Sequence, residues 1–149
     1  MTTDSASRVA DNTAPSVNER IKRQTDERVA EAAVSGPEAI AARLVDLDQE
    51  WDVERCLEMG ASSLCLVGLT LGTTVNRRWY LLPAVVASFL LQHALQGWCP
   101  PLPVFRRLGV RTRDEINEER FALKAVRGDF QRIDTREAGA ALEAVRRAH

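Results

Sequence analysis

The sequence predicts an all-α protein built on a two-helix transmembrane hairpin, flanked by short amphipathic cytoplasmic helices. Two uncharged apolar runs, residues 59–75 and 79–98, are separated only by a short polar tripeptide. As helices at about 1.5 Å per residue, each run reaches about 26–30 Å, close to the hydrocarbon thickness of a bilayer. Val and Ile never alternate with polar residues over a strand's length, so no β-strand is expected.

The amino-terminal part is predicted to be a disordered tail, residues 1–15, followed by an amphipathic helical arm, residues 16–55. The tail is polar and rich in Ser, Thr and Asp. Ser16 and Glu19 then have the spacing of a capping box, in which each side chain satisfies the other's free backbone donor. The arm is therefore expected to begin there.

Gly36 and Pro37 predict the end of one helix and the start of the next, because Gly favours a left-handed cap and Pro fits a first helical turn. The second helix carries apolar residues four, three and four positions apart: Ile40, Leu44, Leu47 and Trp51. This stripe is expected to dock a partner, or to pack against Ile116 and Leu123 of the same chain. With no breaker before Met59, the helix is expected to continue into the first span or to bend at Gly60.

The hairpin itself is predicted for residues 56–99, and its second apolar run is the stronger evidence for a membrane location. Apolar residues cover every side of that helix, which in water would need apolar neighbours all round. The first run is diluted by Gly, Ser and Thr and is expected to insert together with the second. The alternative is a soluble bundle, but the other predicted helices are too polar to bury such a run.

The basic residues beside the spans predict that both termini lie in the cytoplasm. Six arginines flank the spans on the side of the termini, whereas the turn carries Arg77 and Arg78 alone. Trp79 and Tyr80 at the turn, and Trp98 at the other end, occupy positions where interfacial aromatic residues are favoured.

Beyond the hairpin, the sequence predicts a Pro-rich exit loop at residues 100–111 and a helical arm at residues 112–149. Prolines in the loop forbid a continuous helix, because they lack a donor and clash with the preceding turn. The arm is expected to contain one helix that Gly128 ends and a last, Ala-rich helix at residues 135–148.

Small residues predict where the two spans touch. Gly68 and Gly72 form a small-xxx-small pair, and Ala84 and Ser88 offer a matching face on the second helix. In lipid, close backbone approach supplies the packing that drives helix association. The pattern favours packing within the hairpin over dimerisation.

Three polar residues in the second span, Gln92, His93 and Gln96, are costly to bury in a membrane. They are interpreted as fastening the helices through hydrogen bonds to Ser62, Ser63 or Glu58; the alternative is a functional path. Without a second His or an acidic cluster beside them, no metal site is expected.

Cys56 and Cys99 are expected at similar depths, since they are about equally far in sequence from the turn. Two such thiols could accept sulfur, switch by disulfide formation or hold a soft metal, if positive charge from Arg55, Arg106 and Arg107 lowered their pKa. The simpler interpretation is that Cys99 is a small buried residue at a tight helix exit.

The chain resembles the YgaP-like two-helix inner-membrane domain family, a domain family of unknown function. The resemblance covers residues 53–112, and its most specific element is the motif Gly97-Trp98-Cys99-Pro100. The resemblance also rests on three further segments: Glu54-Arg55, Leu90-Leu91-Gln92 and Leu108-Gly109-Val110. The resemblance implies a helical hairpin in a bacterial inner membrane. Some members carry a sulfurtransferase domain, which no segment here matches, so that activity does not carry over.

The function predicted from these observations is a non-enzymatic anchor or protein-interaction module. The expected partners are the lipid bilayer and either a second copy or a cytoplasmic protein. The alternative is a thiol-based redox or sulfur-handling component that uses Cys99 and Cys56. A net charge of −1 gives no reason to expect nucleic acid. No catalytic elbow, phosphate loop or carboxylate pair is present, so neither enzymatic activity nor a cofactor is expected.

Overall fold

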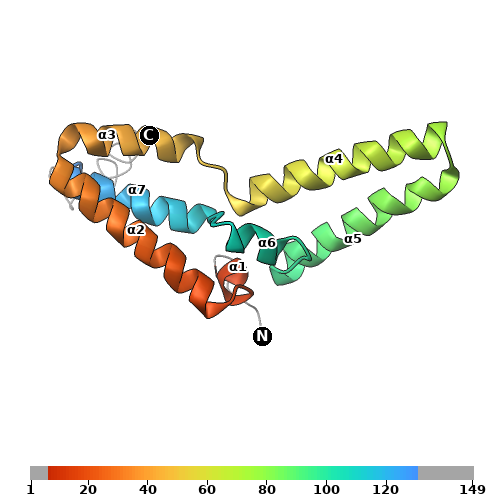
Figure 1. Cartoon of the computed structure of the whole chain (residues 1–149), viewed down its shortest axis with the longest axis horizontal. Coiled ribbons are helices and arrows are strands. Elements are labelled where there is room, and N and C mark those ends of the chain that lie inside the picture. The colour runs from red at the N-terminus through yellow and green to blue at the C-terminus, as the bar shows by residue number, and fades with distance from the viewer. Residues whose placement is uncertain (1–6, 131–149) are drawn as a thin grey trace, which may run out of the picture. The chain divides into compact units, whose positions relative to one another are not determined.

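A computed structural model describes residues 7–130, and all regular structure within them is helical (Figure 1). This confirms the all-α prediction. The chain forms two compact units, one of Met1–Ile21 and Trp51–Asp114 and the other of Lys22–Glu50 and Glu115–His149. The predicted helix at residues 135–148 lies outside the described residues.

The first unit begins with a helical turn, α1 (Arg8–Asp11), where a disordered tail was predicted. Val9 is 4% exposed and packs in a cluster with Val53, Leu57, Cys99 and Leu102. The Thr13 hydroxyl is buried and donates to the Val9 carbonyl at 2.7 Å. The disorder prediction is therefore wrong for the end of the tail, because two short buried side chains tie this segment to distant helices.

An antiparallel helix pair, which we call the α4–α5 pair, dominates the first unit (Figure 1). It consists of α4 (Val53–Thr74), the 3₁₀ turn η1 (Arg77–Tyr80) and α5 (Leu81–Gln96). Within the described residues, one stretch, Pro37–Thr74, which comprises α3 (Pro37–Gln49) and α4, is long and apolar enough to cross a membrane. At 16 residues, α5 alone is shorter than the roughly 17–25 residues of a typical span.

The predicted continuation of the second arm helix into the first span is wrong. The helix α3 (Pro37–Gln49) ends first, and α4 starts anew behind an extended Asp52. The Arg55 backbone N–H donates to Asp52 Oδ1 at 2.7 Å, which is an N-cap bond. The Val53 N–H donates to the Arg111 carbonyl at 2.9 Å, so the break is also held from a distant segment.

The predicted exit loop contains a short helix, α6 (Leu102–Arg107), which corrects the loop prediction. Gly97 ends α5 in a left-handed conformation with φ +74°. Pro101 then stands at the N-cap and Pro103 in the first turn. Proline is tolerated there because the first backbone donors of a helix have no partner within it.

The second unit has its own core, built from the later part of α2 (Pro15–Ser35), from α3 and from α7 (Arg113–Arg127). Pro37 opens α3, and Gly128, with φ +88°, follows α7, as predicted. The predicted stripe of α3 packs against α7 of the same chain, because Ile40, Leu44 and Leu47 share one buried cluster with Ile116 and Leu123. Only Trp51 of that stripe stays exposed, at 41%. The stripe is thus used within the chain.

Candidate functional site

The α4–α5 pair leaves most of its apolar side chains uncovered. Only 22% of the apolar window in Pro37–Thr74 is buried, whereas the core helix of a soluble protein is mostly buried. Side chains on both helices are between 46% and 71% exposed: Leu66, Val67, Leu69, Leu81, Leu91 and Leu95. A contiguous apolar surface of this kind marks a site of interaction with membrane or protein.

Large aromatic residues with a polar atom mark the two ends of this pair. All three Trp residues and the single Tyr lie there, and none lies in the middle. Trp79 and Tyr80 belong to η1, and Trp98 follows the end of α5. Trp51 precedes α4, and the Arg55 guanidinium lies 4.4 Å from its ring centroid. Such rings favour a boundary between apolar and aqueous surroundings.

Two glycines bring α4 against η1 and the start of α5. A Cβ added at Gly68 would lie 2.5 Å from Pro83 Cδ, and one added at Gly72 would lie 2.8 Å from the Tyr80 ring. The face that was predicted to pack against these glycines, Ala84 and Ser88, is not among their nearest neighbours. Both residues are exposed, and the Ser88 hydroxyl donates to the Ala84 carbonyl of its own helix at 2.9 Å. The glycines instead contact residues that precede Ala84 in the chain, because η1 places the Tyr80 ring against Gly72 of α4.

His93 fastens α5 to α4 through a partner that the sequence did not suggest. It is 3% exposed, and its Nε2 lies 3.1 Å from Glu54 Oε2. The other Glu54 oxygen accepts from Arg8 Nη2 at 3.3 Å. The expected partners Glu58, Ser62 and Ser63 are all exposed. Because α5 ends where α4 begins, His93 reaches the first turn of α4 rather than its second or third.

The two glutamines do not join this contact in the way His93 does. Gln92 is half-buried and the Gln96 side chain is exposed. The backbone carbonyl of Gln96 accepts from Asn12 Nδ2 at 2.8 Å, so the residue matters here through its main chain. Within residues 7–130, no three His, Cys, Asp or Glu side chains form a group that could hold a metal ion.

Arg106 is a central residue of this end of the unit, whereas the sequence analysis considered it only as a positive charge beside the second span and the cysteines. It is 1% exposed. Its Nε donates to Thr13 Oγ1 at 3.1 Å, its Nη2 to Asn18 Oδ1 at 2.9 Å and its Nη1 to the Val110 carbonyl at 3.1 Å. The guanidinium thereby joins α6 to the amino-terminal segment. No local periodicity reveals partners so far apart in sequence.

In the motif at the end of α5, Gly97 and Cys99 have a structural use. A Cβ at Gly97 would lie 2.6 Å from the Arg8 carbonyl oxygen, so only glycine allows α1 to approach. Trp98 is 37% exposed, whereas Cys99 is 2% exposed and belongs to the buried cluster. Pro100 is exposed in the turn that leads to α6.

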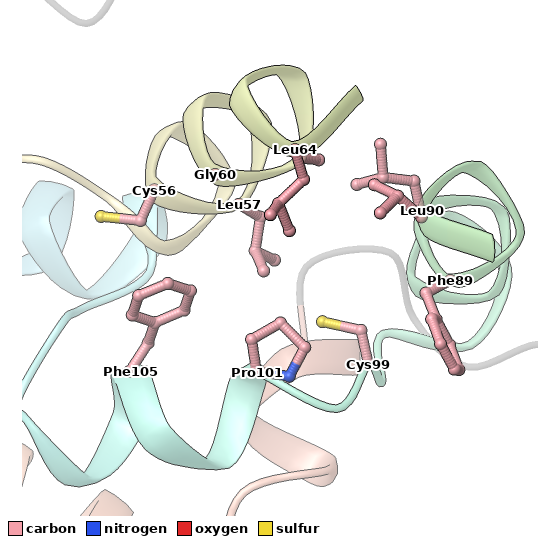
Figure 2. Close-up of a pocket in the computed structure, with 11 residues that line it drawn as sticks. Cys56, Leu57, Gly60, Leu64, Phe89, Leu90, Cys99, Pro101 and Phe105 are labelled. Carbon is pink, nitrogen blue, oxygen red and sulfur yellow. The ribbon is translucent and has the colours of Figure 1, made fainter. Parts of the chain in front are cut away.

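Cys56 and Cys99 line one pocket of about 260 Å³ between α4, α5 and α6. Figure 2 shows the Cys99 side chain directed into the pocket and Cys56 leaving α4 above Phe105. Burial raises the pKa of the Cys99 thiol; the hydrogen bond with the Leu102 backbone lowers it, and the Glu54 carboxylate raises it further. Thiol chemistry at Cys99 required a pKa lowered by nearby arginines, and this condition is not met. A raised pKa leaves less of the reactive thiolate at neutral pH.

No protein-family model, curated protein or solved structure matches this chain.

Proposed function

We propose that the chain is a small integral membrane protein, in which α4, η1 and α5 form a helical hairpin across a lipid bilayer. Its role is that of a non-enzymatic anchor or protein-interaction module, which holds the helical second unit at the membrane. The observation that carries this proposal is the uncovered apolar surface of the α4–α5 pair, bounded at both ends by aromatic residues.

The dimensions of the pair support a hairpin of two spans. The part of η1 and α5 that lacks Asp, Glu, Lys and Arg, residues 79–96, measures about 28 Å. The charge-free part of α4, residues 59–74, measures about 24 Å. Both lengths are near the roughly 30 Å of a bilayer's hydrocarbon core, and neither stretch contains Asp, Glu, Lys or Arg.

Four hydroxyls of the pair, those of Thr70, Thr73, Thr74 and Ser88, donate to backbone carbonyls of their own helices, as hydrocarbon surroundings demand. Thr70 donates to the Leu66 carbonyl at 2.8 Å, and Thr74 donates to the Thr70 carbonyl at 2.7 Å. Thr73 is likewise bonded to Thr70, at 2.8 Å. A polar group left unpaired in lipid costs several kcal/mol, so these exposed hydroxyls are suited to a lipid-facing surface.

We further propose a bacterial inner membrane with both termini in the cytoplasm. The orientation follows from the arginine balance across the pair, and the compartment follows from the resemblance to the YgaP-like family. Both remain predictions.

Membrane extraction tests the hairpin. The full chain, expressed without detergent, is expected in the membrane pellet, resistant to alkaline carbonate and released by mild detergent. Carbonate strips peripheral proteins but leaves spanning helices in place. Recovery of a compact monomer in the high-speed supernatant would contradict the proposal.

The same membranes test the orientation. An epitope at the amino terminus is expected to be digested by added protease in inverted vesicles and protected in right-side-out vesicles. The reverse pattern would overturn the orientation and leave the spans in place.

Thiol chemistry is the second candidate, because Cys56 and Cys99 line the same pocket. A disulfide between their Sγ atoms would pass two electrons and two protons to an external oxidant. For an anchor, Cys99 is expected to react with a membrane-permeant maleimide at least tenfold more slowly than half-buried Cys56, because the Cys99 side chain is only 2% exposed. Burial raises the pKa of both thiols, so the expected difference in rate rests on access to the sulfur. Peptide mass mapping at timed intervals measures both rates. Rapid labelling of native Cys99 would favour the thiol function, and so would loss of partner binding when both cysteines are replaced by Ser.

A further inference from the structure

We infer that the pocket between α4, α5 and α6 holds the hydrocarbon chain of one membrane lipid. The inference rests on the proposed function, since it requires the α4–α5 pair to lie in a bilayer. The pocket is lined by α4 on one side, by α5 on the other and by Cys99, Pro101 and Phe105 at its base (Figure 2).

A gradient of packing along the pair creates this pocket. Near η1 the helices touch, because Gly68 and Gly72 leave no room for a side chain. Two turns earlier the situation is reversed: a Cβ added at Gly60 would meet nothing within 4 Å. Gly60 lines the pocket together with Leu64 and, across from them, Leu90 of α5. The two helices therefore leave a hollow at the end where α6 lies.

The chemistry of the lining selects an apolar occupant. Every lining side chain is hydrocarbon or thiol. A buried water needs two to four polar partners, which these side chains do not supply. The polar side chains of His93 and Arg106 are not part of the lining. His93 Nε2 lies 3.1 Å from Glu54 Oε2 and Arg106 Nε donates to Thr13, whereas His93 Nδ1 is buried without a hydrogen-bond partner.

The pocket is continuous with the exposed surface of the pair, which identifies the source of the occupant. Leu64 and Phe89 line the pocket and are themselves 49% and 39% exposed. In a bilayer these side chains face lipid, so an acyl chain enters the pocket without crossing a polar barrier. A lipid chain is also the one apolar ligand present at high concentration beside this surface.

Photo-crosslinking tests the inference on the full chain in vesicles. The vesicles are dioleoylphosphatidylcholine with a small fraction of phosphatidylcholine that carries a diazirine on one acyl chain. Adducts are expected on residues 99–105, which a lipid chain reaches through the pocket, as well as on exposed Leu66 and Leu91. Gly60→Phe is expected to fill the hollow and lower the adducts on residues 99–105 at least tenfold, with adducts on Leu91 unchanged.

Two further variants make the result specific. Leu66→Phe adds the same ring to the exposed side of α4 and is expected to leave adducts on residues 99–105 within twofold of the unsubstituted chain. Gly60→Leu fills less space and is expected to give an intermediate loss. Circular dichroism of each variant in the vesicles verifies that helix content is kept.

Each other outcome overturns the inference in a distinguishable way. Adducts confined to exposed residues, with all variants alike, would show the pocket empty and leave the hairpin standing. Protein–protein cross-links from residues 99–105 to a second copy would show that another chain covers the pocket. Failure of the chain to float with the vesicles would overturn the proposed function itself.

Discussion

Replacing Leu66 with Arg is expected to cost about 3 kcal/mol of membrane insertion free energy, a loss of roughly 100-fold in the inserted to non-inserted ratio. Leu66 is 66% exposed near the middle of α4. In lipid this position faces hydrocarbon, where a guanidinium is costly. In water the same change would replace an exposed apolar side chain by a charged one, within about 0.5 kcal/mol of neutral. Glycosylation-site mapping in a translocon insertion assay measures the ratio.

Val45 supplies the matched control for this substitution. It is 56% exposed on α3, outside the α4–α5 pair. Val45→Arg is therefore expected to leave insertion unchanged. Equal insertion of both variants, or a Leu66→Arg protein that becomes more soluble and keeps its melting temperature, would show that the pair lies in water.

Replacing Gly68 with Leu is expected to separate α4 from α5 and destabilise their packing by about 2–3 kcal/mol. The new Cβ alone would lie 2.5 Å from Pro83 Cδ and 3.3 Å from the Trp79 carbonyl oxygen, so backbone must move. The proline ring has no rotamer to relieve the overlap. Unfolding in mixed micelles with increasing sodium dodecyl sulfate, followed by circular dichroism and Trp fluorescence, measures the loss.

Gly60→Ala is the control for this effect. It makes the same kind of change on the same helix, but its Cβ would meet nothing within 4 Å. Because Ala favours helix over Gly by up to about 1 kcal/mol, it is expected to leave stability equal or slightly higher. A Gly68→Leu protein as stable as Gly60→Ala would contradict the close contact between the two helices.

Local patterns in the sequence predicted most helices and one of the two cores. The α3 stripe of Ile40, Leu44 and Leu47 follows helical spacing, and its packing against Ile116 and Leu123 of α7 is confirmed. The stops near Gly36 and Gly128 also follow from local chemistry, since both residues have positive φ. Such features depend on neighbours within one or two turns, which a single sequence displays.

The break before α4 was missed because its causes are partly distant. Asp52 is a favourable N-cap residue, but it directly follows an amphipathic stripe that ends at Trp51. The regular spacing of that stripe suggested a helix that continues past residue 51, so the N-cap was not recognised. The break is held by the Arg111 carbonyl, which accepts from Val53, and by Arg113, whose Nε donates to Asp52 Oδ2 at 3.1 Å. Contacts across about sixty residues leave no trace in local periodicity.

The partners of His93 were missed for a related reason. The prediction named Glu58, Ser62 and Ser63, which lie one to two or more turns further into α4 than Glu54. The lengths of α5 and η1 set the true register, in which His93 meets Glu54. The contacts of Gly68 and Gly72 could likewise be predicted only in part. The small-residue spacing predicts that these glycines make a close contact, but which residues oppose them depends on the conformation of η1.

The wide sequence separation of the bonds made by Arg106 has a consequence for biosynthesis. Its partners Thr13 and Asn18 emerge from the ribosome 93 and 88 residues earlier. Thr13 and Asn18 therefore have no bond to Arg106 until both apolar helices have been translated and have left the exit tunnel. The bonds of Arg106 to the amino-terminal segment must form late in assembly, and nascent chains halted before Arg106 are expected to leave the segment around Thr13 and Asn18 more open to proteases than the full chain does.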